Sequence, residues 1–307
     1  MQTWTANIQQ QLTGSLLFEV AYAGSIGMHL AQSYNPNEVL PGPGTLEPRR
    51  LLQPLRNLPS INFIEWRNRS SYHSLQLKGV KRYSNGLQFL AAYTWGKSLD
   101  FAGSVASGGG QTGGPQTVRC LDCQRGPSGF DVRHRAVFSY VYDLPFGPGQ
   151  KRLTSGFASK LVGGWQVSGI TTLTTGRPFN VNLQNGVNNG APSWANRICN
   201  GKLDNPTPSR WFDSSCFVAP PQFTYGNVGR GILYSPGNIN WDVSLVKNTR
   251  FGADARYNAQ LRFEAYNLAN TPYFGFPNAN IGSGTVGQIT STVGDNRSLQ
   301  VAAKFEF

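Results

Sequence analysis

Apolar and polar residues alternate with a period of two along most of this chain, and this alternation constrains the fold more than any other feature. In residues 86–98, Phe89 and Tyr93 fall on one side of an extended backbone, whereas Gln88 and Thr94 fall on the other. Strands with an apolar outside and a small or polar inside are typical of transmembrane β-barrels. We therefore expect Gln88 to face a lumen and Phe89 to face lipid.

A second segment, residues 256–267, places charges on one side of the same alternation. Phe263 lies on the apolar side, and Gln260, Arg262 and Glu264 share the other. Charged side chains on one face of a strand need water or each other, so we predict that these three residues also line a lumen.

Nine strands follow when the alternation is traced through the whole chain. Their ranges are 2–12, 15–24, 72–82, 86–98, 133–144, 164–183, 239–250, 256–267 and 297–307. Their lengths cluster near the ~10 residues with which a tilted strand crosses a bilayer. No run of ~18 apolar residues exists, which excludes a membrane-spanning helix. A membrane protein of this sequence must therefore be a barrel.

The connections between these strands alternate in length. The short ones are residues 13–14, 83–85 and 251–255. The long ones, rich in Gly, Pro, Asn and Ser, are residues 25–71, 99–132, 184–238 and 268–296. Outer-membrane barrels have short periplasmic turns and long extracellular loops, and the chain fits that rule if residues 145–163 form a longer periplasmic turn.

Charge is low in amount but strongly basic in balance. Charged residues make up 14% of the chain, aromatic residues 12%, and the net charge is +12. Such a charge can indicate nucleic-acid binding. Here the basic residues are scattered singly, with no basic cluster or recognition helix, so we predict no nucleic-acid partner.

Four cysteines lie in loop-like stretches as two local pairs, Cys120 with Cys123 and Cys199 with Cys216. Close spacing in loops favours disulfides in an oxidising compartment, although four cysteines allow three connectivities. The alternatives for Cys120 and Cys123 are half of a zinc site or a redox pair. Neither a second ligand pair nor a strand-to-helix context is visible in the sequence.

Catalytic and metal-binding patterns do not emerge from the sequence. His29, His73 and His134 are far apart and lack neighbouring ligands at metal-binding spacing. No G-x-S-x-G segment occurs. We therefore expect no enzymatic activity, no catalytic or cofactor-binding residues and no bound metal or cofactor.

The last strand ends on an aromatic residue. Its apolar side carries Leu299, Val301, Ala303, Phe305 and Phe307. Lys304 and Glu306 lie on the opposite side, which we expect to face the lumen. We interpret the apolar side as a closing strand whose terminal aromatic is recognised by the outer-membrane assembly machinery. The alternative is an ordinary amphipathic strand that happens to end in Phe.

Six segments resemble, in order, the barrel of TonB-dependent receptors of the Oar-like type found in Acidobacteria. They are YTWGKSLD (93–100), FDVRHR (130–135), YDLPFG (142–147), GWQVSG (164–169), TGRPF (175–179) and NWDVS (240–244). The resemblance runs from about residue 2 to the end. It implies an all-β, antiparallel transmembrane barrel of 22 strands, plugged by an N-terminal domain and driven by the inner-membrane TonB complex.

The resemblance also implies that residues 1–307 are only the C-terminal portion of such a barrel. Nine strands would leave two unpaired edges, which lipid does not tolerate. The plug domain and the TonB-binding segment are missing, and no signal peptide follows Met1, so we expect a fragment of a longer chain. The expected partners are outer-membrane lipid, the remaining barrel strands, the plug domain, the TonB complex through the missing N-terminal part, and the assembly machinery.

Three functions fit these patterns to different degrees. The first is a bacterial outer-membrane receptor for TonB-dependent uptake of an unidentified ligand. The second is a passive structural or adhesive outer-membrane barrel without energy coupling. The third, a soluble secreted β-domain that binds carbohydrate, fits the outward aromatic faces poorly.

Overall fold

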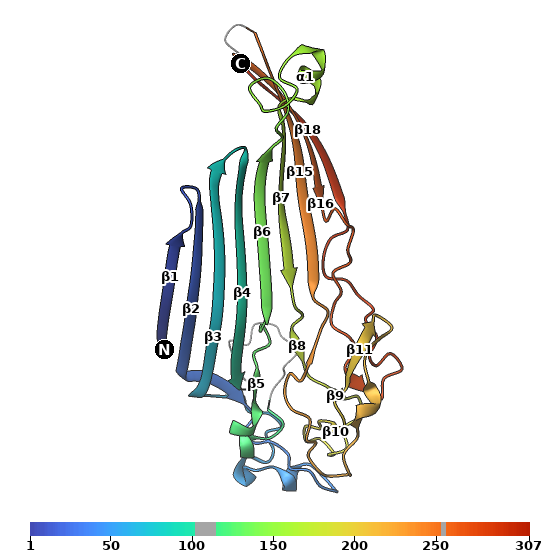
Figure 1. Ribbon diagram of the computed structural model, residues 1–307. Coiled ribbons are helices and arrows are strands. Elements are labelled where there is room, and N and C mark those ends of the chain that lie inside the picture. Colours follow the sequence, from blue (N-terminus) through green and yellow to red (C-terminus); the bar gives the residue numbers. More distant parts are fainter. Residues whose placement is uncertain (102–114, 253–255) are drawn as a thin grey trace.

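The computed structural model describes residues 1–101, 115–252 and 256–307, and it is an all-β molecule built on one antiparallel sheet (Figure 1). Nine strands follow one another across this sheet in chain order. They are β1 (Gln2–Gln11), β2 (Leu16–Tyr34), β3 (Phe63–Ser84), β4 (Leu87–Phe101), β6 (His134–Asp143), β7 (Trp165–Thr174), β15 (Asn238–Phe251), β16 (Tyr257–Tyr266) and β18 (Ser298–Glu306). The short strand β5 (Arg125–Pro127) pairs with the end of β4. The sheet is not closed, so β1 and β18 form its two edges.

The predicted number and order of the strands agree with the structure, but three boundaries were wrong. β2 and β3 continue pairing as far as Tyr34 and Phe63, inside the predicted loop 25–71. Irregularities between Gly27 and Leu30 shift the register there and interrupt the alternation that the prediction relied on. β7 ends at Thr174 rather than at residue 183.

β7 ends where the pairing with both of its neighbours ends, since Thr174 is the last residue opposite Arg135 and Asn238. Two residues later, Gly176 approaches the backbone of another segment closely. A Cβ at this position would lie 1.6 Å from the carbonyl oxygen of Ser235. Beyond it the chain leaves the sheet, and Pro178–Phe179 (β8) pairs with Leu233–Tyr234 (β14).

We call the end of the sheet with the short connections the turn end and the opposite end the loop end. At the turn end, β3 and β4 are joined by a tight hairpin. Asn85 and Gly86 both have positive φ, 53° and 78°, as a two-residue turn matched to strand twist requires. The connection 145–163, predicted only as a longer turn, contains the helix α1 (Gly156–Val162). Residues 253–255 of the predicted turn 251–255 lie outside the described residues.

Register divides the sheet into two faces, because residues directly opposite each other in antiparallel strands project to the same side. We call one the apolar face; it includes Ile8, Val20, Leu77, Phe89, Phe138, Val167, Leu245, Phe263 and Val301. We call the other the polar face; it includes Gln9, Glu19, Lys78, Gln88, Ser139, Ser168, Ser244, Glu264 and Gln300.

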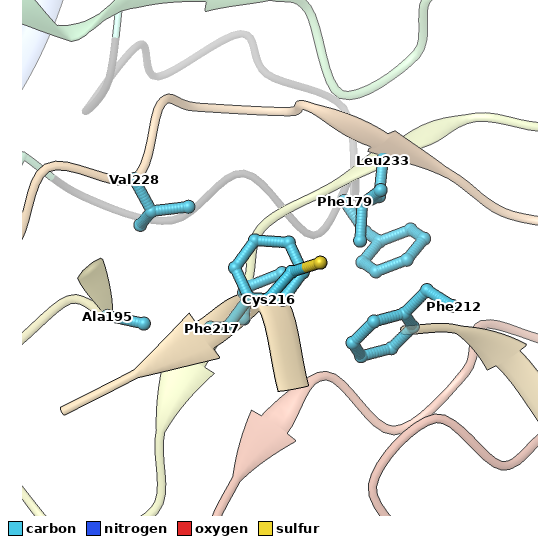
Figure 2. Close-up of a cluster of buried hydrophobic side chains, with 8 residues drawn as sticks. Phe179, Ala195, Phe212, Cys216, Phe217, Val228 and Leu233 are labelled. Carbon is cyan, nitrogen blue, oxygen red and sulfur yellow. The ribbon is translucent and has the colours of Figure 1, made fainter. Parts of the chain in front are cut away.

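The main buried hydrophobic cluster lies outside the sheet, in the loops at the end opposite α1 (Figure 1). We call residues 178–236 and 273–293 the loop cap. Its remaining strands are β9 (Asn182–Leu183), β10 (Asn196–Arg197), β11 (Lys202–Thr207), β12 (Arg210–Phe212), β13 (Phe217–Val218) and β17 (Asn280–Ile281). Figure 2 shows Phe179, Phe212 and Phe217 gathered around Cys216, and all four side chains are at most 4% exposed.

Short 3₁₀ helices complete the described loops. They span Glu47–Arg49, Gln53–Leu55, Val118–Cys120, Asp122–Gln124 and Ser214–Cys216. Within the described ranges, none of the helices is both long and apolar enough to cross a membrane.

Candidate functional site: the polar face and the loop cap

The residues predicted to line a lumen all lie on the polar face. On β16, Gln260 is opposite Asn248 and Lys304, and its Nε2 donates to Asn248 Oδ1 at 3.0 Å. Arg262 Nη1 lies 3.7 Å from Glu264 Oε1. The polar side chains of this face therefore bond to each other along and across the strands.

Ion pairs on β18 and between β2 and β3 extend the same pattern. Lys304 Nζ lies 2.7 Å from Glu306 Oε1 on β18, and Lys78 Nζ lies 3.5 Å from Glu19 Oε2 across β2 and β3. These pairs are partly exposed, and such pairs contribute little to stability. Their charges require contact with water on this face.

A hollow of about 590 Å³ lies against the middle of the polar face. Gln88 lines it, together with Ser168, Asp242 and Glu264 from the following strands. Apolar side chains such as Ile170 are interspersed there, so this part of the wall offers both hydrogen-bonding groups and apolar surface.

The apolar face carries aromatic residues near both ends of the strands. At the turn end, the rings of Phe251, Tyr257 and Phe305 lie 5.7 to 6.1 Å apart. Leu299, Val301 and Ala303 lie on the same face of β18, and Phe307 follows its last residue. Recognition of this strand end by an assembly machinery stays a prediction.

At the loop end of the apolar face, two histidines are each bonded to a tyrosine. Tyr22 Oη lies 2.6 Å from His73 Nδ1, and Tyr93 Oη lies 2.7 Å from His134 Nδ1. His29 belongs to an irregular part of β2 and has a φ of 55°. Among the described residues, no group of three or more His, Cys, Asp or Glu is arranged to hold a metal ion.

The four cysteines form two disulfides in the structure, Cys120–Cys123 and Cys199–Cys216. The second joins residues 17 apart and places Cys216 in the loop-cap cluster, at 4% exposure. This disulfide therefore links the segment around Cys199, just after β10, to the hydrophobic cluster of the loop cap.

A buried ion pair links the loop cap to the sheet. Arg230 Nη2 contacts Asp100 Oδ1, and Arg230 Nη1 donates to the Asp100 carbonyl at 2.8 Å. Both side chains are at most 5% exposed. Losing one partner of such a buried pair leaves an uncompensated charge, so the contact fixes the cap at the end of β4.

The loop between β2 and β3 is bonded to the next loop and to the loop cap. Glu38 accepts from Thr117 Oγ1 at 2.6 Å and from the Val118 amide at 2.9 Å. Arg49 Nη2 donates to the Asn189 carbonyl of the loop cap at 2.7 Å. The loops therefore form one connected layer at this end of the sheet.

Between the loop cap and the polar face lies a smaller hollow of about 160 Å³. Arg135 from the polar face and Arg177, which directly precedes the cap, line it together with Tyr273 and Phe276. The Arg177 guanidinium lies 5.2 Å from the centre of the Phe276 ring. Arginine beside aromatic rings can bind anionic or planar groups.

Sequence reasoning did not find the loop-cap cluster, the Asp100–Arg230 pair or the Arg135–Arg177 hollow. Their residues come from segments far apart in the chain and follow no period. A partial signal was present at Trp211, Phe212 and Phe217, three aromatic residues close to Cys216 in a predicted loop.

The outer membrane beta barrel domain family matches residues 1–300. No curated protein matches the chain. Among solved structures, BauA, the ferric preacinetobactin receptor from Acinetobacter baumannii, is 10% identical with a TM-score of 0.46. The outer membrane transporter YddB from Escherichia coli is 8% identical with a TM-score of 0.47, and FpvAI in its complex with pyocin S2 is 13% identical with a TM-score of 0.43. Each alignment covers 99% of this chain but only 29%, 32% and 27% of those proteins, respectively.

Proposed function

Because the chain belongs to the outer membrane beta barrel domain family, and so to the bacterial outer membrane, we propose that it forms part of the wall of a TonB-dependent uptake receptor. The finer assignment to the Oar-like type rests on the sequence resemblance. In this proposal the polar face lines the lumen, the apolar face contacts lipid, and the loop cap lies outside the cell.

The observation that carries the proposal is the division of one sheet into an apolar and a polar face. The apolar face leaves Trp95 and Trp241 almost half exposed, and Ile239 is 49% exposed. The polar face holds ion pairs that need water. A soluble sheet buries its apolar side, whereas a barrel wall turns that side to lipid.

The open edges support assembly with further strands. Every residue of β1 and β18 is exposed, and Ile8 and Leu299 are 76% and 70% exposed. Unpaired strand edges are not stable in lipid. We propose that these edges pair with the remaining strands of a 22-stranded barrel, and that a plug domain occupies the lumen against the hollow at Gln88.

The ligand would reach the lumen past the loop cap. The hollow between Arg135 and Arg177 lies where the cap meets the polar face, so a ligand with an anionic group would bind there before entering the lumen. This proposal leaves no step for a catalytic residue or a bound cofactor.

Depletion of solutes from the medium tests this function. We would compare cells that carry the protein, cells that lack it, and cells that carry it but lack TonB, using mass spectrometry of the spent medium. The proposal expects a solute whose depletion requires both proteins. Depletion that persists without TonB would indicate a passive barrel, and unchanged uptake with a loss of surface attachment would indicate the structural or adhesive alternative.

A further inference from the structure

The helix α1 lies at the turn end of the apolar face. Lys247 Nζ donates to the carbonyls of Lys160 and Leu161 at 2.9 and 3.1 Å, and also contacts the Gly163 carbonyl. Trp165 Nε1 donates to the Leu161 carbonyl at 3.2 Å. Trp165 and Lys247 are opposite each other on the apolar face, so they fix the C-terminal end of α1 beside that face.

The helix turns its large apolar side chains away from the protein. Phe157 is 84% exposed and Leu161 is 64% exposed, and residues four apart lie on the same side of a helix. Ser159, on the opposite side, is only 2% exposed. Figure 1 shows α1 at the end of the sheet that is remote from the loop cap.

The connection that contains α1, residues 144–163, is basic. Its charged residues are Lys151, Arg152 and Lys160, and it contains no Asp or Glu. All three basic residues are exposed. Apolar side chains beside basic ones are typical of segments that lie in the boundary of an anionic membrane.

Given the proposed function, on which this inference rests, we infer that α1 is an interfacial helix that inserts Phe157 and Leu161 into the periplasmic leaflet. The basic residues contact the phosphates of anionic phospholipids. Two features select lipid as the occupant: α1 is bonded at its C-terminal end to Trp165 and Lys247 of the apolar face, and the basic residues complement anionic headgroups. The helix would thereby set the depth of β7 and β15 in the bilayer.

Site-directed fluorescence tests this inference in the native protein, reconstituted in nanodiscs. Both disulfides occupy all four cysteines of the chain, so Phe157→Cys adds one reactive thiol to it. We would label it with a nitrobenzoxadiazole dye and compare quenching by aqueous iodide with quenching by a lipid nitroxide near the headgroup. Thr154→Cys, in the same connection, is the matched control for a water-exposed site.

Nanodiscs of phosphatidylethanolamine with phosphatidylglycerol should quench the dye at Phe157 through the lipid nitroxide and protect it from iodide. The label at Thr154 should show the opposite behaviour. Replacing Lys151, Arg152 and Lys160 together by Gln should weaken the lipid quenching at Phe157 in these discs more than in discs of phosphatidylcholine alone. Iodide quenching at Phe157 equal to that at Thr154 would overturn the inference.

A label at Phe263→Cys on the apolar face separates the two proposals. Lipid quenching at Phe263 with water exposure at Phe157 would remove only the role of α1. Water exposure at both sites would remove the membrane orientation of the sheet itself. Protection of Phe157 from both quenchers would mean that a protein covers α1, and would also overturn the inference.

Discussion

The sheet and the loop cap place their apolar side chains in opposite ways. In the sheet, Phe138 and Phe263 are 39% and 38% exposed on the apolar face. In the loop cap, Phe179 and Phe212 are 1% and 2% exposed and pack on each other. In the proposed receptor the sheet depends on lipid for its apolar contacts, whereas the cap packs its apolar side chains internally, as a small folded domain does.

The two regions therefore obtain stability from different sources. Removing apolar volume is expected to weaken the loop cap and to affect the apolar face of the sheet much less. Introducing charge is expected to destabilise the sheet when it is placed on the apolar face and to be tolerated on the polar face.

The largest effect is expected for Phe212→Ala in the loop cap. The substitution leaves a cavity beside Phe179 and Phe217, and such changes cost about 3 to 5 kcal/mol. Hydrogen exchange in residues 178–236 measures the loss of cap stability. Ile198→Ala, at a side chain 66% exposed in the same region, is the control. Equal loss of exchange protection in β6 and β7 would show that cap and sheet are one cooperative unit.

Replacing Cys199 and Cys216 together by Ala is expected to destabilise the loop cap by about 3 kcal/mol, the chain-entropy value for a loop of this size. Proteolysis of the cap, followed over a urea series, measures it. The matching replacement of Cys120 and Cys123 opens a bridge between residues three apart, outside the cap, and should leave cap proteolysis unchanged. Identical effects of the two pairs would contradict the assignment of Cys216 to the cap's centre.

Phe263→Arg tests the sheet. The side chain lies on the apolar face opposite Leu245 and Val301, and an Arg there is expected to cost about 2 kcal/mol, between the values for midplane and interface positions. Urea-dependent folding into vesicles measures this cost. Ser244→Arg, on the polar face opposite Glu264, gains an ion-pair partner and is expected to fold almost normally. Equal losses for both variants would refute the division into two faces.

The sequence allowed the sheet to be predicted because an apolar and a polar face impose a period of two on every strand of the sheet. The nine strands and the side taken by Gln260 or Phe263 follow from that period alone. The prediction failed at Gly27 and Leu30, where irregular register interrupts the alternation, and after Thr174, where β7 loses both of its partners.

The loop cap and α1 could not be predicted in the same way. The cap's cluster joins Phe179, Phe212 and Leu233 through tertiary contacts that leave no periodic trace in the sequence. The Asp100–Arg230 pair joins residues 130 apart. Helix α1 is too short for a clear period of 3.6, and only the spacing of Phe157 and Leu161 hinted at it.

The smallest effect is expected at Asp213, on the surface of the loop cap. A change there should act locally and leave the hydrophobic cluster of the cap intact. Ser215 Oγ donates to Asp213 Oδ1 at 2.8 Å, and this bond, with those from the Ser215 amide and Arg210, lowers the pKa of Asp213 below its ordinary value. Because the folded-state pKa is the lower one, the contribution to stability is present above the unfolded pKa and is lost as pH falls through the folded pKa. Ser215→Ala should therefore raise the pKa of Asp213 and remove this contribution, with the difference in stability from the native protein vanishing in strong acid.

Carbon-detected NMR titration of the Asp213 carboxyl measures the shift in pKa. Ser209→Ala is the control, because the Ser209 hydroxyl bonds to Thr207 instead. An unchanged pKa in Ser215→Ala, or an equal shift in Ser209→Ala, would mean that Ser215 does not hold this carboxylate in the folded cap.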